Sequence, residues 1–218
     1  MLPLSMKTKH SRFLYFTFSF TILLSAFLLF QIQPLIGKYI LPWFGGTSFV
    51  WITSLLFFQI ILLGGYFYSF MITKLSIRKQ LLIHSILVLG SASLMTLLFS
   101  HWTSPITPDV SIKMPETLSP VLQVLAVLTI SVGLPYFLLS TTSTLLQKWF
   151  SHLPNQKSPY PLYALSNIGS LAAICTYPFL IEPFLSLQNQ GQIWSFLFLT
   201  LCFFLFLSIV QILSLIHI

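Results

Sequence analysis

Charged residues are scarce in this chain of 218 residues. Ten Lys and Arg and three Asp and Glu make up only 6% of it, whereas an average soluble domain carries about 25% charged residues. Hydrophobic residues make up 56%, and the mean hydropathy is +0.92. Because so few charges cannot hydrate the surface of a soluble fold, the composition excludes a soluble globule and predicts a surface that faces lipid.

Cysteines, acidic residues and catalytic motifs are also rare or missing. Cys175 and Cys202 both lie in apolar stretches, so we interpret them as core residues and not as a disulfide or a metal site. Asp109, Glu116 and Glu182 are the only acids, and the sequence has no phosphate-binding glycine loop, His-Glu zinc motif or Ser-His-Asp set. We therefore expect no enzyme activity, cofactor or metal from the chain as it stands.

Long charge-free stretches are what the sequence has instead. Six of them can each hold the roughly 20 helical residues that cross about 30 Å of hydrocarbon. We predict an all-α fold, an integral membrane bundle of six transmembrane helices, after a basic N-terminus at 1–12. Within 13–212 the spans are expected near 13–36, 48–72, 81–99, 118–139, 162–180 and 193–212. The first span is favoured over a signal peptide because it is long and no cleavage site follows it.

The basic residues predict how the bundle is oriented. With a cytoplasmic N-terminus, eight basic residues fall inside and two fall outside, which favours an N-in and C-in topology. The inner set is Lys7, Lys9, Arg12, Lys74, Arg78, Lys79, Lys148 and Lys157, and the outer set is Lys38 and Lys113. Basic residues scattered among apolar runs do not form a nucleic-acid-binding stripe, so the expected partner is the lipid bilayer and not nucleic acid.

A few polar side chains interrupt the apolar spans. Lys38 and Glu182 lie at the outer ends of the first and fifth spans, where they either form an ion pair or snorkel independently. We interpret the other polar groups as partners in interhelical hydrogen bonds, with ligand binding as the alternative; they are Gln31, Gln33, Gln59, Gln123, Ser166 and Asn167. His84 is expected as a neutral imidazole that is hydrogen-bonded to backbone.

Small residues and prolines mark sites of packing and helix distortion. Gly169 belongs to a face of small residues, formed with Ser166, Ser170 and Ala173, that lets another helix approach. Pro135 and Pro178 are predicted to kink their helices, as happens in transporters and also in inert bundles. Residues 41–46 are expected to turn at the outer interface, with Trp43 as an anchor and Gly45 and Gly46 in the reversal. Residues 101–117, with three prolines, are expected as an exposed loop.

Three segments resemble the membrane region of spermidine synthase-like integral membrane proteins. The run from Leu28 to Ser69 contains a Gln-x-Gln-Pro piece at Gln31, Gln33 and Pro34 and a Pro-Trp-Phe-Gly-Gly piece at 42–46. The runs 133–150 and 160–183 follow in the family's order, the second with Ser-Asn-x-Gly-Ser at 166–170. On this basis the chain is identified as similar to that family from about residue 20 to residue 185.

The resemblance implies a function that composition does not. In that family the helical region precedes a cytoplasmic aminopropyltransferase-like domain with a Rossmann-like fold, so the chain is expected to be a fragment of a polyamine-related, transporter-like protein of the bacterial inner membrane. No catalytic or cofactor-binding residue carries over, because the nucleoside-binding loop and catalytic aspartate have no counterpart here. The alternative is a stand-alone six-helix transporter-like or scaffold protein. The oligomeric state is left open.

The positions that we select as candidates rest on this resemblance and on the rarity of polar groups in lipid. They are Gln31, Gln33, Pro34, Lys38, Trp43, Gly45, Gly46, Gln59, Pro135, Asn167, Gly169, Tyr177, Pro178 and Glu182. Residues 213–218 read LSLIHI, which is also the translation of a transposon end used to prepare sequencing libraries. We expect an adapter artefact there, with a genuine apolar tail as the alternative.

Overall fold

The computed structural model describes residues 4–102, 104–107, 118–153 and 158–216, with side chains of the first helix described from Arg12 onward. All regular structure in these residues is helical, which confirms the all-α prediction. The helices are α1 (Leu4–Phe44), α2 (Ser48–Ile72), α3 (Ile77–His101), α4 (Pro120–Leu128), α5 (Leu134–Ser151), α6 (Tyr160–Thr176) and α7 (Leu187–Ile216), with π-helical turns η1 (Thr129–Gly133) and η2 (Tyr177–Ile181).

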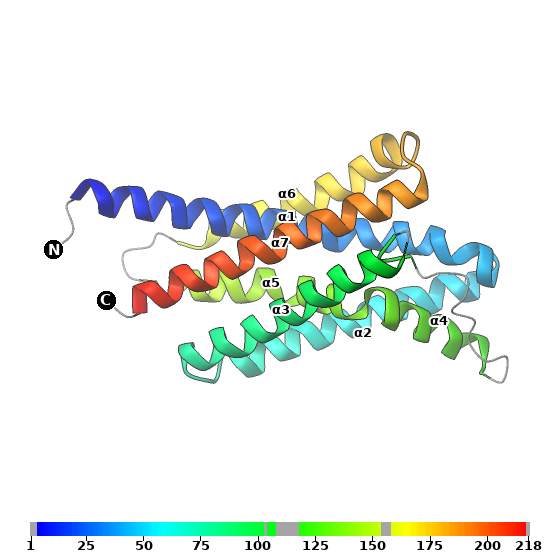
Figure 1. Cartoon of the computed structure of the whole chain (residues 1–218), viewed down its shortest axis with the longest axis horizontal. Coiled ribbons are helices and arrows are strands. Elements are labelled where there is room, and N and C mark those ends of the chain that lie inside the picture. The colour runs from blue at the N-terminus through cyan, green and yellow to red at the C-terminus, as the bar shows by residue number, and fades with distance from the viewer. Residues whose placement is uncertain (1–3, 103, 108–117, 154–157, 217–218) are drawn as a thin grey trace.

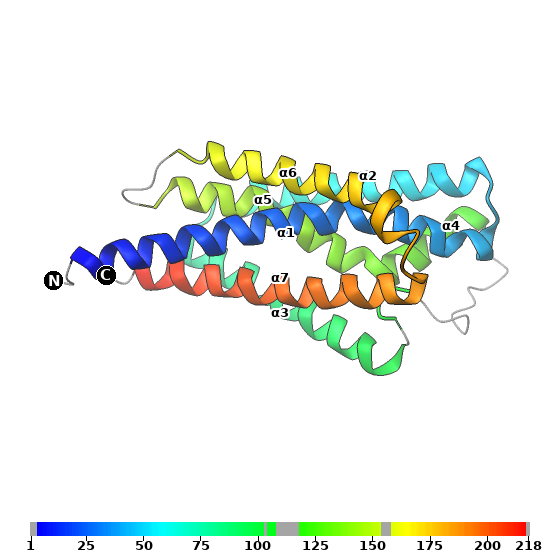
Figure 2. The same cartoon turned by 90° about the horizontal axis from the view of Figure 1, so that it is seen from above.

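Six helical segments are long and apolar enough to cross a membrane, since α4, η1 and α5 form one segment and α6 and η2 another. The chain is therefore an integral membrane protein by fold. Figure 1 shows the segments side by side along one long axis. In Figure 2, α1 lies between α6 and α7, and α1 also contacts α5 and α2. The bundle is thus built around its first helix.

The two ends of the bundle carry different charges. We call the end where α1 begins and α7 ends the terminal end, and the end that holds the α1–α2 and α6–α7 connections the opposite end (Figure 1). Described side chains at the terminal end include Arg12, Lys74, Arg78, Lys79 and Lys148, whereas the opposite end has Lys38 and Glu182. Lys113, Lys157, Asp109 and Glu116 lie outside the described residues. The described charges are thus sorted between the two ends in the way that the sequence predicted.

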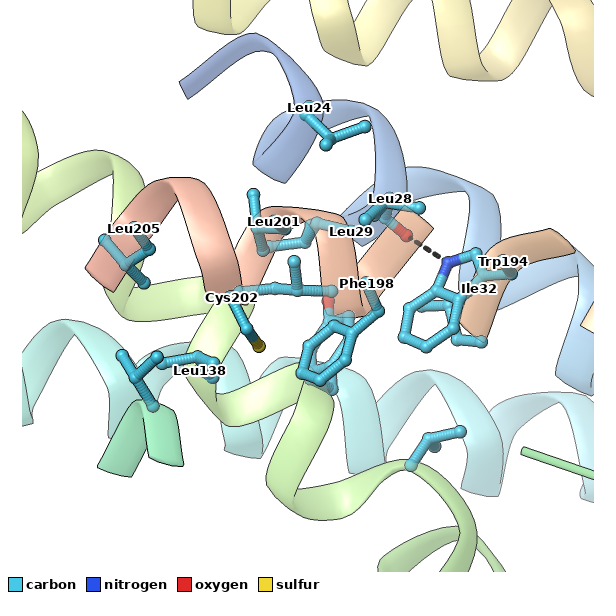
Figure 3. Close-up of a cluster of buried hydrophobic side chains, with 14 of the residues drawn as sticks. Leu24, Leu28, Leu29, Ile32, Leu138, Trp194, Phe198, Leu201, Cys202 and Leu205 are labelled. Carbon is cyan, nitrogen blue, oxygen red and sulfur yellow. Dashed lines mark hydrogen bonds between the residues drawn. The ribbon is translucent and has the colours of Figure 1, made fainter. Parts of the chain in front are cut away.

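The interior of the bundle is apolar where α1 meets α7. Figure 3 shows four α1 side chains, Leu24, Leu28, Leu29 and Ile32, against a row on α7 that runs from Trp194 to Leu205. The Trp194 Nε1–H donates to the Leu28 carbonyl oxygen at 3.0 Å, which satisfies the indole donor in the core. Cys202 is buried in this contact, as predicted, but Cys175 is exposed on α6, so its interpretation as a core residue is wrong.

The first helix is longer than its predicted span. It continues through Pro34 and Pro42 to Phe44, so the expectation that residues 41–44 belong to a turn is wrong. The reversal starts at Gly45, which has a φ of 81° in the left-handed region, and the Gly45 N–H donates to the Leu41 carbonyl at 2.8 Å. Glycine ends the helix here because it enters this conformation without a Cβ clash. The apolar run alone could not locate this end.

Two other segments also extend beyond the predicted spans. The helix that contains α5 continues to Ser151, and α7 begins at Leu187, so Gln188 to Gln192 are helical. Hydropathy marks where a helix is apolar, and the hydrogen-bonded helix continues into its polar flanks. The connection after α3 was expected to be exposed. For residues 104–107 this is wrong, because Ile106 is fully buried and Ser104 packs against the Gly191 backbone.

The helices deviate from α-geometry beside two of the prolines. Proline has no N–H, so Pro135 and Pro178 leave the carbonyls four residues earlier without an α-helical donor. The backbone responds with the π-helical turns η1 and η2, in which hydrogen bonds span five residues. In η2, the Glu182 N–H reaches the Tyr177 carbonyl at 2.8 Å. The expected disturbance therefore takes the form of a wider turn at each site.

The small-residue face of α6 packs on α1, as its spacing predicted. Gly169 and Ala173 are buried and Ser166 and Ser170 are half-buried. A Cβ placed on Gly169 would lie 2.5 Å from the Leu23 carbonyl oxygen and 3.2 Å from the Ala26 Cβ. The α1 backbone can therefore approach α6 this closely only because residue 169 is glycine.

Gly169→Ala tests this close approach. We expect the added methyl group to lower the free energy of unfolding by about 1–3 kcal/mol, because the α1 backbone must move. The matched control is Gly90→Ala, since Gly90 is a helical glycine on α3 with no atom within 4 Å of a built Cβ. The control should be neutral or stabilising by up to about 1 kcal/mol through helix propensity. Thermal unfolding of both variants in detergent measures the difference, and equal shifts would contradict the packing.

Candidate functional site

The buried amide of Gln31 on α1 forms hydrogen bonds with α6. Its side chain is 3% exposed, and its Nε2 donates to the Ala173 carbonyl and to Thr176 Oγ1, both at 3.2 Å. Thr176 also donates to the Ala172 carbonyl, at 2.6 Å. An amide without partners would be costly in an apolar interior. These bonds therefore tie α1 to the last turn of α6, directly before η2.

Gln33 makes a comparable contact with a different helix. Its Nε2 donates to the Tyr136 phenol oxygen on α5 at 3.0 Å. Tyr136 is 1% exposed and lies in the first turn of α5, next to Pro135 and soon after η1. The centre of its ring lies 4.8 Å from the centre of the Phe58 ring on α2. Two glutamines of one helix thus bind residues beside the two π-helical turns.

Gln190 completes the polar group from the beginning of α7. Its Oε1 accepts a hydrogen bond from the Tyr177 phenol at 3.2 Å, and its Nε2 donates to the Leu185 carbonyl at 2.8 Å. Tyr177 is the first residue of η2. We define the amide cluster as Gln31, Gln33, Tyr136, Thr176, Tyr177 and Gln190. Its members come from α1, α5, α6, η2 and α7.

Lys38 and Glu182 form an ion pair next to this cluster, at the opposite end of the bundle. Lys38 Nζ lies 2.8 Å from Glu182 Oε1, and the side chains are 45% and 42% exposed. Of the two alternatives left by the sequence, the structure contains the pair. It joins α1 to the residue that ends η2, and it is the one ion pair found among the described residues.

A small cavity lies between α1, η2 and α7 beside the cluster. Its volume is about 180 Å³, less than the roughly 300–1,000 Å³ of most ligand pockets. Its surface is almost entirely apolar, because the Nε2 of Gln31 and the amide of Gln190 are paired within the protein. The lining residues are Phe27, Leu28, Gln31, Leu35, Ile181, Leu185, Gln190, Ile193, Trp194 and Leu197. The cavity therefore offers an apolar space next to the cluster.

Other candidate positions lie away from this cluster. Gln59 is exposed on α2 and Asn167 is exposed on α6, and neither hydrogen-bonds another described side chain. Trp43 is half-buried with its ring 5.8 Å from that of Tyr39. Pro34 is half-buried within α1, Pro178 is exposed in η2 and Gly46 is exposed after α1. Side chains that are exposed on the membrane spans face lipid. The prediction that Gln59 and Asn167 form interhelical hydrogen bonds is therefore wrong within this bundle.

Sequence reasoning missed four residues that complete the site. In the sequence, nothing distinguishes Tyr136 and Trp194 from the other aromatic residues of the spans, or Thr176 from the other hydroxyl residues. Gln190 was placed before the last span because that span was expected to begin at residue 193. The spacing of four residues between Gln190 and Trp194 would have put both on one helix face, but only if the helix had been extended to include them.

His84 differs from its expected environment. It is fully buried on α3, and its Nδ1 lies 3.4 Å from the Tyr68 phenol oxygen, so the predicted backbone partner is wrong. Its Nε2 has no hydrogen-bond partner among the described residues. The His84 ring is edge-on to Trp149 at 5.5 Å. This aromatic contact lies nearer the terminal end and is separate from the amide cluster.

The composition of the cluster limits its chemistry. Its amides do not act as acids or bases, and its two phenols, Tyr136 and Tyr177, are hydrogen-bonded to the neutral amides of Gln33 and Gln190 and not to an activating base. No group of three His, Cys, Asp or Glu side chains in the described parts of the chain could hold a metal ion. No family model, curated protein or solved structure matches the chain. The site is therefore suited to binding or to helix positioning.

Gln31→Leu tests whether the amide cluster holds α1 to α6. We expect a loss of about 1–2 kcal/mol of stability, because the variant removes two interhelical hydrogen bonds and leaves Thr176 and the Ala173 carbonyl without them. Gln59→Leu is the matched control, since it makes the same change on an exposed face and should shift stability by less than about 0.5 kcal/mol. Detergent unfolding curves of both variants provide the comparison. A larger loss in the control would refute the assignment.

Charge reversal tests the ion pair. Lys38→Glu should lower the melting temperature because two carboxylates then face each other, and Lys38→Glu combined with Glu182→Lys should restore it. The coupling is expected at about 0.2–1 kcal/mol because both side chains are almost half exposed. The coupling is measured from the melting temperatures of the unchanged protein, the two single variants and the double variant, at low and high salt. It should become smaller as the salt concentration rises. Strictly additive effects would mean that the pair does not form.

Proposed function

We propose that this chain is the membrane domain of a spermidine synthase-like protein of the bacterial inner membrane. In this proposal the bundle anchors an aminopropyltransferase-like domain at the cytoplasmic face and couples it to transport of a small molecule. The catalytic chemistry belongs to the soluble domain, because the described cluster contains no acid-base pair. In this proposal the bundle positions the soluble domain at the membrane, and its amide cluster supplies hydrogen-bonding groups within the apolar interior.

The observation that carries the proposal is the convergence of the three similar segments. Gln33 of the first segment bonds Tyr136 of the second, and Gln31 bonds Thr176 of the third. The same first and third segments also form the Lys38–Glu182 pair. Residues of the motifs are thus bonded in pairs although they lie more than 100 positions apart. The polar pairing of all three similar segments through one helix supports treating them as parts of one membrane domain.

The arrangement of the chain ends agrees with an attached cytoplasmic domain. α7 ends beside the start of α1 at the terminal end (Figure 2), where the described basic side chains gather. Basic residues favour the cytoplasmic side. A domain that follows α7 would therefore lie on the side where an aminopropyltransferase finds its substrates.

A stand-alone transporter-like protein is the second candidate, and a specific feature favours it. The two π-helical turns flank the amide cluster, and a cavity of about 180 Å³ opens beside Gln31. Transporters place interrupted helices around a central polar site, and π-turns are frequent at functional sites. A scaffold role, by contrast, requires only packing and predicts that changes in the cluster affect stability alone.

The test begins with the gene read from unfragmented DNA through the codon for Ile212, followed by expression of the complete reading frame. Purified protein should bind decarboxylated S-adenosylmethionine in calorimetry if a synthase-like domain follows α7. A frame that stops after Ile218, or full-length protein that does not bind the nucleoside, would reject the enzymatic half.

Flux through the bundle separates the two candidates further. Proteoliposomes with the complete protein should take up radiolabelled spermidine, and Gln33→Leu should reduce uptake about tenfold or more if Gln33 contacts the transported molecule. Gln59→Leu serves as the control on a lipid-facing surface. Nucleoside binding without flux supports an anchor, and flux without nucleoside binding supports the stand-alone transporter.

A further inference from the structure

A second and larger cavity lies at the terminal end of the bundle, away from the amide cluster. Its volume is about 370 Å³, within the range of small-molecule sites. It is enclosed by the α2–α3 connection, the last turns of α5 and the last turns of α7. Leu215 and Ile216 also line it, but its floor and its polar rim are formed by residues that precede Leu213.

The floor of this cavity is held rigidly by hydrogen bonds. Gln80 is 7% exposed; its Nε2 donates to the Leu75 carbonyl at 2.7 Å, and its Oε1 accepts from Trp149 Nε1 at 2.9 Å. One side chain therefore fixes the α2–α3 connection to α5. Because the polar atoms of Gln80 and Trp149 are already paired, recognition of a ligand falls to the rim.

The rim is positively charged and has no acidic partner in the described part of the chain. Lys148 lines the cavity and is exposed on the last turn of α5, and His152 follows one turn later. The His152 Nδ1 lies 2.7 Å from the Lys148 carbonyl oxygen, so the other ring nitrogen, Nε2, is the one that can contact a ligand. Arg78 and Lys79 are exposed on the first turn of the neighbouring α3. Such a concentration of positive charge attracts anions.

The walls identify what kind of anion fits. Leu75, Ile77, Leu153 and Ile212 line the cavity together with the Trp149 ring, so most of the surface below the charged rim is apolar. A free phosphate ion would gain nothing from these walls, whereas an amphiphile would place its charge at the rim and its carbon chain below. The cavity also lies where the candidate membrane spans end.

We propose that this cavity binds the phosphate headgroup of an anionic phospholipid. Lys148 and His152 contact the phosphate, and Leu75, Ile77 and Ile212 contact the glycerol and the first acyl carbons. Basic pockets between transmembrane helices suit such headgroups, and each basic side chain near the surface contributes to the attraction. The inference is independent of the proposed function, since it uses none of the residues of the amide cluster.

The experiment measures melting of the delipidated full chain in neutral detergent as ligand is added. The ligands are phosphatidylglycerol, phosphatidylcholine with the same acyl chains, glycerol phosphate and inorganic phosphate. We expect phosphatidylglycerol to raise the melting temperature saturably, and the other three to have no effect at equal concentration. Equal stabilisation by inorganic phosphate or glycerol phosphate would overturn the lipid assignment, as would equal stabilisation by phosphatidylcholine.

Matched variants separate a site from a diffuse positive surface. Lys148→Gln should weaken the apparent affinity for phosphatidylglycerol about fivefold, the effect of one basic contact, and His152→Gln should weaken it also. Lys79→Gln removes the same charge at the same end but does not line the cavity, so it should change affinity less than twofold. Equal effects of Lys148→Gln and Lys79→Gln would overturn the proposal. Unchanged elution in size-exclusion chromatography shows that each variant is folded.

Discussion

The hydrocarbon region of a membrane contains no water, and this shapes every part of the bundle. Backbone and side-chain polar groups there must find partners within the protein. The chain meets most of this requirement with long helices and with bonds such as the one from Trp194 to the Leu28 carbonyl, although a few buried polar atoms, among them His84 Nε2, have no partner among the described residues. Beside Pro135 and Pro178 the backbone forms π-helical turns, whereas α1 continues as an α-helix through Pro34 and Pro42. The two turns lie next to Tyr136 and Tyr177, which hydrogen-bond to Gln33 and Gln190.

The first helix organises the remaining elements for the same reason. It contacts α2, α5, α6 and α7, and its polar side chains are directed to different neighbours: Gln31 to α6, Gln33 to α5 and Lys38 to the end of η2. Gly169 lets the α6 backbone come close enough for the Gln31 amide to reach it. The close packing of α1 and the hydrogen bonds of its polar side chains therefore depend on each other. A change that moves α6 away from α1 would also lengthen the hydrogen bonds of Gln31.

The two ends of the bundle have distinct chemical characters. The amide cluster with its ion pair lies toward the opposite end and combines neutral hydrogen-bonding groups with balanced charge. The terminal end presents unbalanced positive charge around an apolar cavity with a Gln80–Trp149 floor. Neutral amides suit recognition within lipid, whereas exposed cations suit the anionic surface of a membrane.

Hydropathy, charge and local spacing act along the chain, and they were enough to predict the six apolar helices, the sorting of charge between the ends and the small-residue face that contains Gly169. That Gln33 meets Tyr136, that Lys38 meets Glu182 and that Gln59 and Asn167 face outward is visible only in the folded bundle. The physical reason is that spans which are apolar on all sides have no hydrophobic face to mark the interior. Helix neighbours then depend on packing and hydrogen bonds between distant residues.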